Sequence, residues 1–328
     1  MVSGWPRMFD VKLQGTADPQ FRSDVLSGLR GPRRAIPARW FYDARGSELF
    51  DDITRLPEYY PTRTETALLE SSSYSLAALI SSGAAVIEFG AGSATKTPLL
   101  LEAIAPSAYV PIDISGDYLR LSADVLQSRF PNLKVIPVEA DFTGSVELPD
   151  DLVTAERLGF FPGSTIGNFV PRSSVDLLRH MRTILGEGAK LLIGFDRIKP
   201  DNVLIPAYDD AAGVTAAFNL NLLNRINREL NGDIPVDAFV HDVRWNDMQS
   251  RIEMHLRCRR NIRFSVAGEA FAMHAGDSIH TENSHKYDLR GLRLLLRAGS
   301  WTPIADFSDS NDWFTLVLAE AAPLFAAP

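Results

Sequence analysis

The stretch Ala84-Ala-Val-Ile-Glu-Phe-Gly-Ala-Gly-Ser-Ala-Thr-Lys96 decides the fold. Its apolar part, Ala85 to Phe89, predicts a short buried strand that runs into a glycine turn and then a helix. Gly90 and Gly92 allow positive φ and let a ligand approach the backbone closely, and the helix N-terminus offers unpaired N–H groups. Thr95 stands where a dinucleotide fingerprint requires its third glycine, so the turn favours a nucleoside-like ligand over a pyrophosphate. Taken alone, the turn is equally consistent with an ordinary loop.

Further strands alternate with helices after this turn, and one more helix is predicted before it. The predicted strands are Ala108 to Ile112, Lys134 to Glu139, Glu156 to Phe161 and Lys190 to Asp196, with two closing strands at 299–306 and 313–319. The predicted helices are Thr64 to Leu79, Thr97 to Ile104, Asp117 to Arg129, Pro171 to Leu185 and Asp288 to Ala298. This alternation predicts an α/β fold with a mostly parallel sheet, whose ligands bind beyond the carboxyl ends of the strands.

Acidic residues stand at the ends of three successive predicted strands. Glu88 lies in the first strand, Asp113 follows the second, and Asp141 with Phe142 follows the third. In a βαβ unit an acid at the position of Asp113 accepts hydrogen bonds from ribose hydroxyls. Asp141 and Phe142 suit an adenine, with the carboxylate near its amine and the ring against its face. Each acid taken alone is better explained as a solvated loop residue or helix cap, but three in register after successive strands favour a nucleoside site.

The α/β alternation stops after Asp196. A long helix is expected to end near Leu230, and Ala238 to Val243, Arg251 to Arg259 and Asn261 to Val266 read as the strands of a β-meander. We interpret this region as an inserted subdomain. Nearer the N-terminus, Tyr59 and Tyr60 lie between two prolines, which predicts a stiff loop. Such tyrosines either pack at the edge of a core or bind a small polar ligand.

Composition excludes several classes of protein. The 328 residues carry a net charge of −8 without a long basic run, so no nucleic-acid partner is expected. No stretch approaches the ~18 apolar residues of a membrane span, and the first residues lack the apolar core of a signal peptide.

The single cysteine, Cys258, excludes a disulfide within the chain and fits a reducing cytoplasm. Its arginine neighbours would favour a reactive thiol, but a buried filler is the simpler interpretation. A cytoplasmic monomer is expected.

The available side chains indicate ligand orientation rather than nucleophilic or metal catalysis. No Gly-x-Ser-x-Gly motif is present, and the spacing of His280, Glu282 and His285 does not match a helical zinc motif, so no metal is expected. Polar groups gather instead in segments predicted as loops: Tyr42, Tyr59, Asn168, Tyr208, Glu282 and Ser284. This set suits a small zwitterion with a polar side chain. Methyl transfer from a sulfonium fits, because it needs an in-line neutral amine and little acid–base help.

Five long motifs carry a family resemblance that extends from about residue 20 to 320. They are Trp40-Phe-Tyr-Asp, Leu56-Pro-Glu-Tyr-Tyr-Pro-Thr-Arg-Thr-Glu65, Gly163-Ser-Thr-Ile-Gly-Asn168, Ala207-Tyr-Asp-Asp-Ala-Ala-Gly-Val-Thr-Ala-Ala-Phe-Asn219 and His280-Thr-Glu-Asn-Ser-His-Lys-Tyr287. The chain resembles the histidine-specific Nα-methyltransferases of ergothioneine biosynthesis. The resemblance implies three methylations of the L-histidine α-amino group, giving hercynine, with S-adenosylmethionine as the methyl donor.

The resemblance also implies a fold, a domain organisation and residue roles. It implies a Rossmann-like class I S-adenosylmethionine-dependent methyltransferase core with an inserted α+β substrate-binding domain. The core would comprise residues 63–197 and 286–328, and the substrate domain residues 1–62 and 198–285. The substrate residues implied are Tyr42, Tyr59, Gly163, Asn168, Tyr208, Met254, Glu282 and Ser284, with Tyr59 and Asn168 as the catalytic pair. The cofactor residues implied are Glu88, Gly90, Gly92, Lys96, Asp113, Asp141 and Phe142.

Two other functions remain open at the level of the sequence. One is a methyltransferase for another amino acid or amine, because the same residues suit other zwitterions. The other is a dinucleotide-dependent oxidoreductase or a binding module with a Rossmann core. The missing third glycine argues against the oxidoreductase.

Overall fold

The computed structural model describes residues 18–92, 94–149, 152 and 156–322. Strand β1 (Ala85–Phe89), which leads into the glycine turn, lies inside a large sheet. The sheet order is β12 (Trp301–Ser308), β13 (Phe314–Ala321), β6 (Lys190–Asp196), β5 (Arg157–Phe161), β1, β2 (Ala108–Asp113) and β3 (Lys134–Val135), and β4 (Val138–Glu139) also pairs with β2. Neighbours from β6 to β4 are parallel, whereas β13 is antiparallel to both β6 and β12. The predicted α/β fold class is confirmed.

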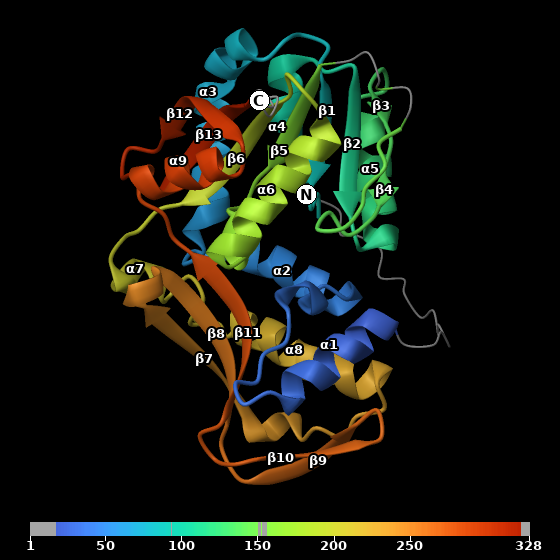
Figure 1. Ribbon diagram of the computed structural model, residues 1–328, viewed down its shortest axis with the longest axis vertical. Helices are drawn as coiled ribbons and strands as arrows, with labels where there is room; N and C mark the ends of the chain where they lie inside the picture. Colours follow the sequence, from blue (N-terminus) through green and yellow to red (C-terminus); the bar gives the residue numbers. More distant parts are fainter. Residues whose placement is uncertain (1–17, 93, 150–151, 153–155, 323–328) are drawn as a thin grey trace, which may run out of the picture.

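Helices cover both faces of this sheet (Figure 1). One face packs against α3 (Tyr60–Leu79), α4 (Thr97–Ile104) and α5 (Gly116–Arg129), and the other against α6 (Pro171–Leu185) and α9 (Leu289–Ala298). Successive side chains of β1 point to opposite faces, so Ile87 joins one core and Val86 the other. Because both faces are covered, β1 is buried along its whole length.

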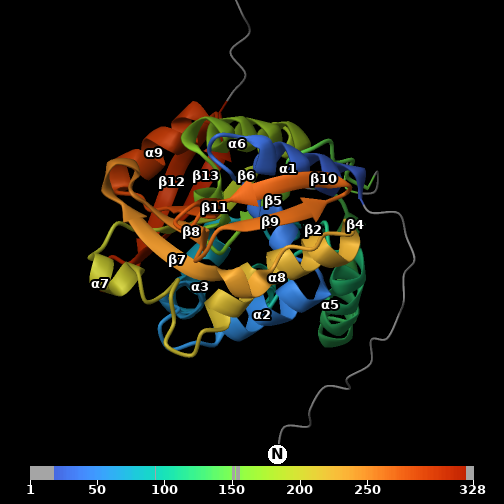
Figure 2. The same cartoon turned by 90° about the horizontal axis from the view of Figure 1, so that it is seen from below.

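A second group of elements lies beyond the carboxyl ends of the parallel strands, in the lower half of Figure 1 and nearest the viewer in Figure 2. Its elements are α1 (Pro19–Arg30), η1 (Ala38–Phe41), α2 (Ala44–Thr54), α7 (Asp201–Leu204), α8 (Val214–Glu229), η4 (Val236–Ala238), β7 (Phe239–Asn246), η5 (Asp247–Gln249), β8 (Arg251–Cys258), β9 (Ile262–Val266), β10 (Glu269–Met273) and β11 (Ser278–His285). They share a separate hydrophobic core, drawn from residues 21–60 and 204–279. Cys258 is buried in it.

The predicted meander is wrong in its third strand. β7 and β8 pair as expected, but the next partner of β8 is β11, and β9 pairs with β10 in a sheet of its own. The cause is a two-residue turn at Ala267 and Gly268, whose φ values of 52° and 84° fit the tight hairpins that join adjacent antiparallel strands. β11 thereby takes the place next to β8.

The N-terminal segment is more helical than predicted. Tyr60 begins helix α3 and Tyr59 is its N-cap, so the two tyrosines do not lie on a loop. Helix α2 begins after Asp43, whose side chain accepts a hydrogen bond from Gly46 N at 2.7 Å. The predicted strand Lys134 to Glu139 is broken into the short strands β3 and β4. The outermost parts of the predicted domains, 1–17 and 323–328, lie outside the described residues.

Candidate active site

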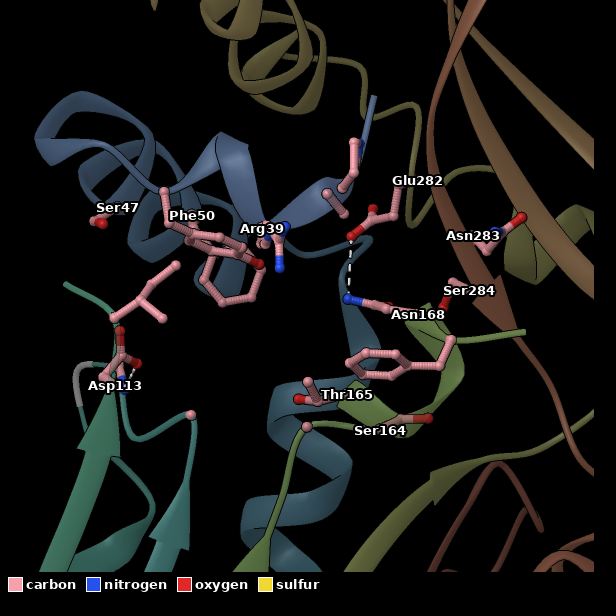
Figure 3. Close-up of a pocket in the computed structure, with 18 of the residues that line it drawn as sticks. Arg39, Ser47, Phe50, Asp113, Ser164, Thr165, Asn168, Glu282, Asn283 and Ser284 are labelled. Atoms are coloured by element: carbon pink, nitrogen blue, oxygen red, sulfur yellow. Dashed lines mark hydrogen bonds between the residues drawn. The ribbon is translucent and has the colours of Figure 1, made fainter. Parts of the chain in front are cut away.

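A cavity of about 990 Å³ lies between the large sheet and the second group of elements. All fifteen site residues named from the sequence line it. Its floor is formed by the turns that follow β1, β2, β4 and β5, and its opposite wall by η1, α2 and β11. Figure 3 shows the two sides facing each other, with Asp113 on one and Glu282 on the other.

The glycine turn places backbone without side chains on the floor of the cavity. Gly90 and Gly92 have φ values of 72° and 50°, which side chains rarely allow. A Cβ placed on Gly90 would lie 3.2 Å from the ring of Phe142. Asp113 fixes the turn by accepting a hydrogen bond from Gly92 N at 3.0 Å. The aromatic ring, the bare glycine and the strand-end carboxylate therefore border one space.

Two carboxyl groups are buried behind this turn. Glu88 accepts hydrogen bonds from Thr97 Oγ1 at 2.7 Å and Tyr109 Oη at 2.6 Å, and burial raises its pKa to about 7. Glu65 forms an ion pair with Lys96 and accepts from Gly163 N at 2.8 Å. Glu65 thereby connects α3 to the floor of the cavity. No role was predicted for Glu65, although it ends one of the quoted motifs.

Asp141 contacts the opposite wall of the cavity. Its carboxylate accepts from Arg39 Nη1 at 3.0 Å, and Arg39 also pairs with Asp24 at 2.7 Å. Arg39 belongs to η1 and Asp24 to α1. A bridge of charges thus joins the second group of elements to the turn after β4.

The residues that the resemblance links to an imidazole lie on adjacent strands. Glu282 and Ser284 are on β11, two positions apart, so their side chains share a face of the sheet. Met254 on β8 pairs directly with Glu282. Glu282 and Ser284 therefore lie on a strand rather than the loop predicted for them. Burial raises the pKa of Glu282 to about 7, although the positive charge of Lys286 lowers it.

Asn168 connects the floor of the cavity to strand β11. It is the last residue of η3 (Thr165–Asn168), which follows β5, and its Nδ2 donates to Glu282 Oε1 at 3.3 Å. Figure 3 shows this bond crossing the space between the two walls. The side-chain amide of Asn168 therefore links η3 to the Glu282 carboxylate on β11.

Three tyrosines complete the wall of the cavity. The rings of Tyr59 and Tyr208 lie edge to face with centroids 6.3 Å apart, and Tyr42 packs against Phe50 at 5.6 Å. Burial, reinforced by nearby carboxylates such as Glu282, holds the pKa of all three phenols well above their usual range. These groups stay protonated near neutral pH and serve as neutral hydrogen-bonding groups.

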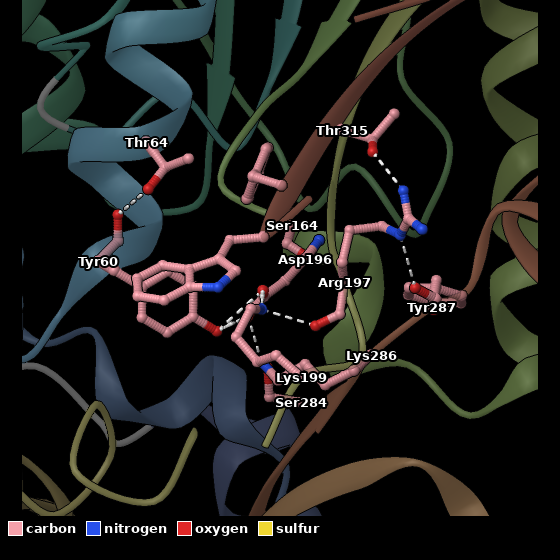
Figure 4. Close-up of polar contacts among 12 residues, drawn as sticks. Tyr60, Thr64, Ser164, Asp196, Arg197, Lys199, Ser284, Lys286, Tyr287 and Thr315 are labelled. Carbon is pink, nitrogen blue, oxygen red and sulfur yellow. Dashed lines mark hydrogen bonds and ion pairs between the residues drawn. The ribbon is translucent and has the colours of Figure 1, made fainter. Parts of the chain in front are cut away.

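A buried charge cluster behind the tyrosines was not predicted (Figure 4). The carboxylate of Asp196, at the end of β6, lies 2.5 Å from Lys199 Nζ and 2.6 Å from Lys286 Nζ, and accepts from Tyr60 Oη at 2.8 Å. Lys286 also contacts Tyr208 and so reaches the cavity wall. The positions of Tyr60 inside the motif 56–65 and of Lys286 inside the motif 280–287 were the available sequence signals.

The histidines on β8 and β11 are engaged with nearby protein groups. His280 Nε2 lies 2.9 Å from Glu282 O, and His285 Nδ1 lies 3.1 Å from Gln249 O. His280 stacks on His255 beside Glu253, and ligand atoms of the three lie within 4.8 Å of one another. Arg251 already pairs with that carboxylate at 2.6 Å.

Within the described part of the chain, no helix is both long and apolar enough to cross a membrane.

Comparison with known proteins places the chain in a family. Residues 21–321 match the family described as histidine-specific methyltransferase, SAM-dependent. Histidine N-alpha-methyltransferase of Mycolicibacterium smegmatis is 40% identical over 83% of this chain and 86% of its own. The protein of the same name from Mycobacterium tuberculosis is 38% identical over 91% of this chain and 94% of its own. Ergothioneine biosynthesis protein 1 of Neurospora crassa is 27% identical over 93% of this chain and 36% of its own. The chain therefore belongs to the S-adenosylmethionine-dependent, histidine-specific methyltransferases.

Proposed function

We propose that the protein transfers three methyl groups from S-adenosylmethionine to the α-amino group of L-histidine, giving hercynine in the first step of ergothioneine biosynthesis. One observation carries the proposal. A single cavity is bordered by the glycine turn on one side and by the linked pair Asn168 and Glu282 on the other. The names of the relatives support the same substrate and pathway.

The proposed domains correspond to two hydrophobic regions: the large sheet with the cores on both of its faces, and the second group of elements with its separate core. Residues 63–197 and 286–328 form the cofactor domain, and residues 1–62 and 198–285 form the substrate domain. The separate core of residues 21–60 and 204–279 supports this division. The protein works in the cytoplasm as a monomer, which the single reduced Cys258 suits.

The residues on the floor fit the methyl donor. Gly92 leaves open space for a ligand, because a Cβ there would have no neighbour within 4 Å, whereas Gly90 packs against the ring of Phe142. Asp113 faces ribose hydroxyls, and Asp141 faces the adenine amine. Glu88 and Lys96 complete this cofactor set from behind the turn. When bound, S-adenosylmethionine supplies a methyl group on a positively charged sulfur.

The opposite wall and the turn that follows β5 hold the amino acid. Glu282 and Ser284 read the imidazole, and Met254 packs beside it. The amino-acid end is held by the remaining substrate residues, which are Tyr42, Tyr59, Gly163, Asn168 and Tyr208. Asn168 suits this place because its amide offers one acceptor and two donors.

The reaction is a direct displacement by the neutral α-amine. The nitrogen lone pair forms the new N–C bond while the C–S bond breaks and its electron pair stays on sulfur. Tyr59 and Asn168 orient the nitrogen in line with the methyl group, which removes much of the entropic cost. The product ammonium loses a proton before each following transfer, until the third leaves a quaternary nitrogen. Because the phenols stay protonated, they do not take this proton, but their rings favour the growing cation.

Mass spectrometry of L-histidine incubated with the protein and S-adenosylmethionine tests the proposal. A product heavier by three methyl groups, fragmenting with all three on the α-nitrogen, is expected. The twenty standard amino acids are assayed in parallel with a labelled methyl donor. Turnover of another amino acid but not of histidine would contradict the proposed substrate while leaving the methyltransferase family in place.

A further inference from the structure

Lys286 is a buried ammonium that the proposed mechanism does not use. Its Nζ lies 2.6 Å from Asp196 Oδ2, 2.7 Å from Tyr208 Oη and 2.8 Å from Ser284 Oγ, and its side chain has no exposed area. An ammonium has three N–H donors and no acceptor. Three partners therefore use all three hydrogens, and Lys286 itself offers none to the cavity.

The two hydroxyls that accept from Lys286 also bond to each other. Tyr208 Oη and Ser284 Oγ lie 2.7 Å apart, so one donates its hydrogen to the other. This leaves one hydroxyl hydrogen for the pair. Among the residues that the structure describes, neither oxygen has a further hydrogen-bond partner, and both residues line the cavity. The remaining O–H is therefore free to donate to a ligand.

We propose that Lys286, held in place by Asp196, is a positioning residue that orders the Tyr208 and Ser284 hydroxyls so that they present one O–H donor to an unprotonated ring nitrogen of the substrate. This inference rests on the proposed function. Glu282 accepts from the other ring position, an N–H. The site thereby selects a neutral azole with one donor and one acceptor nitrogen.

The charge of Lys286 strengthens this selection. A hydroxyl that accepts from an ammonium becomes a stronger donor, because hydrogen bonds in a chain polarise one another. The same ammonium repels a cationic ring at short range in a poorly solvated site. A ring that lacks the acceptor nitrogen leaves the O–H unpaired, which costs binding free energy.

The test compares L-histidine with the two regioisomers of β-(pyrrolyl)alanine, which keep one ring N–H and lack the acceptor nitrogen. Affinities are measured by calorimetry for the wild type, Lys286→Met and the control Lys199→Met. Lys199 pairs with the other oxygen of Asp196 and with Tyr60, and does not line the cavity. The wild type and Lys199→Met are expected to prefer histidine at least about tenfold. Lys286→Met is expected to bind all three ligands within about threefold of one another and to keep its affinity for S-adenosylhomocysteine.

The outcomes separate this inference from the proposed function. A wild type that does not methylate histidine overturns both. A wild type that methylates histidine, with Lys286→Met retaining the full preference for it, overturns the role of Lys286 alone. If melting curves show that Lys286→Met does not fold, Lys286→Gln replaces it. Equal wild-type affinity for histidine and both pyrrole analogues overturns the inference without any variant.

Discussion

Glu282 combines a functional position with an unfavourable environment for its charge. Its carboxyl group accepts from Asn168 at 3.3 Å, and burial raises its pKa from 4.5 to about 7 despite the nearby Lys286. The folded state therefore binds a proton more readily than the unfolded chain. The contribution of this proton to the free energy of unfolding is fully present below pH 4.5 and is lost as the pH rises through about 7. This destabilised carboxylate is the group that we assign to the imidazole.

Replacing Glu282 by Gln is expected to stabilise the protein and weaken its substrate binding. The amide has no charge to desolvate, so the melting temperature of the variant should exceed that of the wild type at pH 8, with the gain shrinking as the pH falls and vanishing below about pH 4.5. Histidine affinity should fall about tenfold or more, because the ring N–H loses its charged acceptor, while affinity for S-adenosylhomocysteine should hold. Calorimetry and melting curves at both pH values measure this. The exposed Glu48→Gln serves as control, and a matching gain there would contradict the assignment.

At the scale of elements, the sequence predicted best those strands and helices whose side chains all lie in one kind of environment, such as a strand buried on both faces. β1 is apolar along nearly its whole length because both faces are buried, and its glycine turn follows from the same pattern. β11 was missed because its polar residues Glu282 and Ser284 line the cavity, so apolar and polar residues do not alternate as in a half-buried strand.

The sequence indicated residues that line one cavity, but not how they are arranged in it. Motif spacing indicated Asn168 and Glu282, yet nothing local reveals that η3 packs against β11. Hydrogen bonds between residues 114 positions apart depend on the tertiary fold. The Asp196 cluster was missed for the same reason, because its lysines resemble surface residues until both are found buried.

The contact between η3 and β11 depends on one glycine. A Cβ on Gly167 would lie 2.8 Å from His285 O and 3.1 Å from His285 N, and these backbone atoms cannot rotate away. Gly167→Ala should therefore push η3 from β11 and displace Asn168 from Glu282. We expect a loss of about 1–3 kcal/mol in the free energy of unfolding and a raised KM for histidine. Urea unfolding and initial rates measure both.

Gly31→Ala is the matched control for this substitution. Its Cβ would meet its nearest neighbour, Arg33 O, at 3.4 Å, and it lies outside the cavity. A Gly167→Ala enzyme as stable as the control and with unchanged KM would show that η3 and β11 tolerate separation.

At the scale of the molecule, the chain passes between its two hydrophobic regions next to the Asp196 cluster. Tyr60 begins helix α3, Asp196 ends β6, and Lys286 follows β11. Burial opposes ionisation of Asp196, but Lys286 and Lys199 outweigh it and hold the pKa of the carboxyl below its usual value. Burial lowers the pKa of Lys199 to about 8 even beside this carboxylate. One anion thus compensates two buried cations where the two regions meet.

Asp196→Asn should destabilise the whole molecule in a pH-dependent way. Removing the carboxylate leaves two buried ammonium groups uncompensated, and we expect a loss of about 3–5 kcal/mol in the free energy of unfolding at pH 7. Without Asp196 the pKa of Lys199 falls below its wild-type value of about 8, so the variant sheds this buried charge at a lower pH than the wild type and the deficit should shrink as the pH rises toward 8. Urea unfolding between pH 7 and 10 measures this, with Asp52→Asn at the exposed pair with Arg55 as control, expected to change stability by less than about 1 kcal/mol. A deficit that stays constant with pH would mean that lost packing, rather than uncompensated charge, weakens the junction.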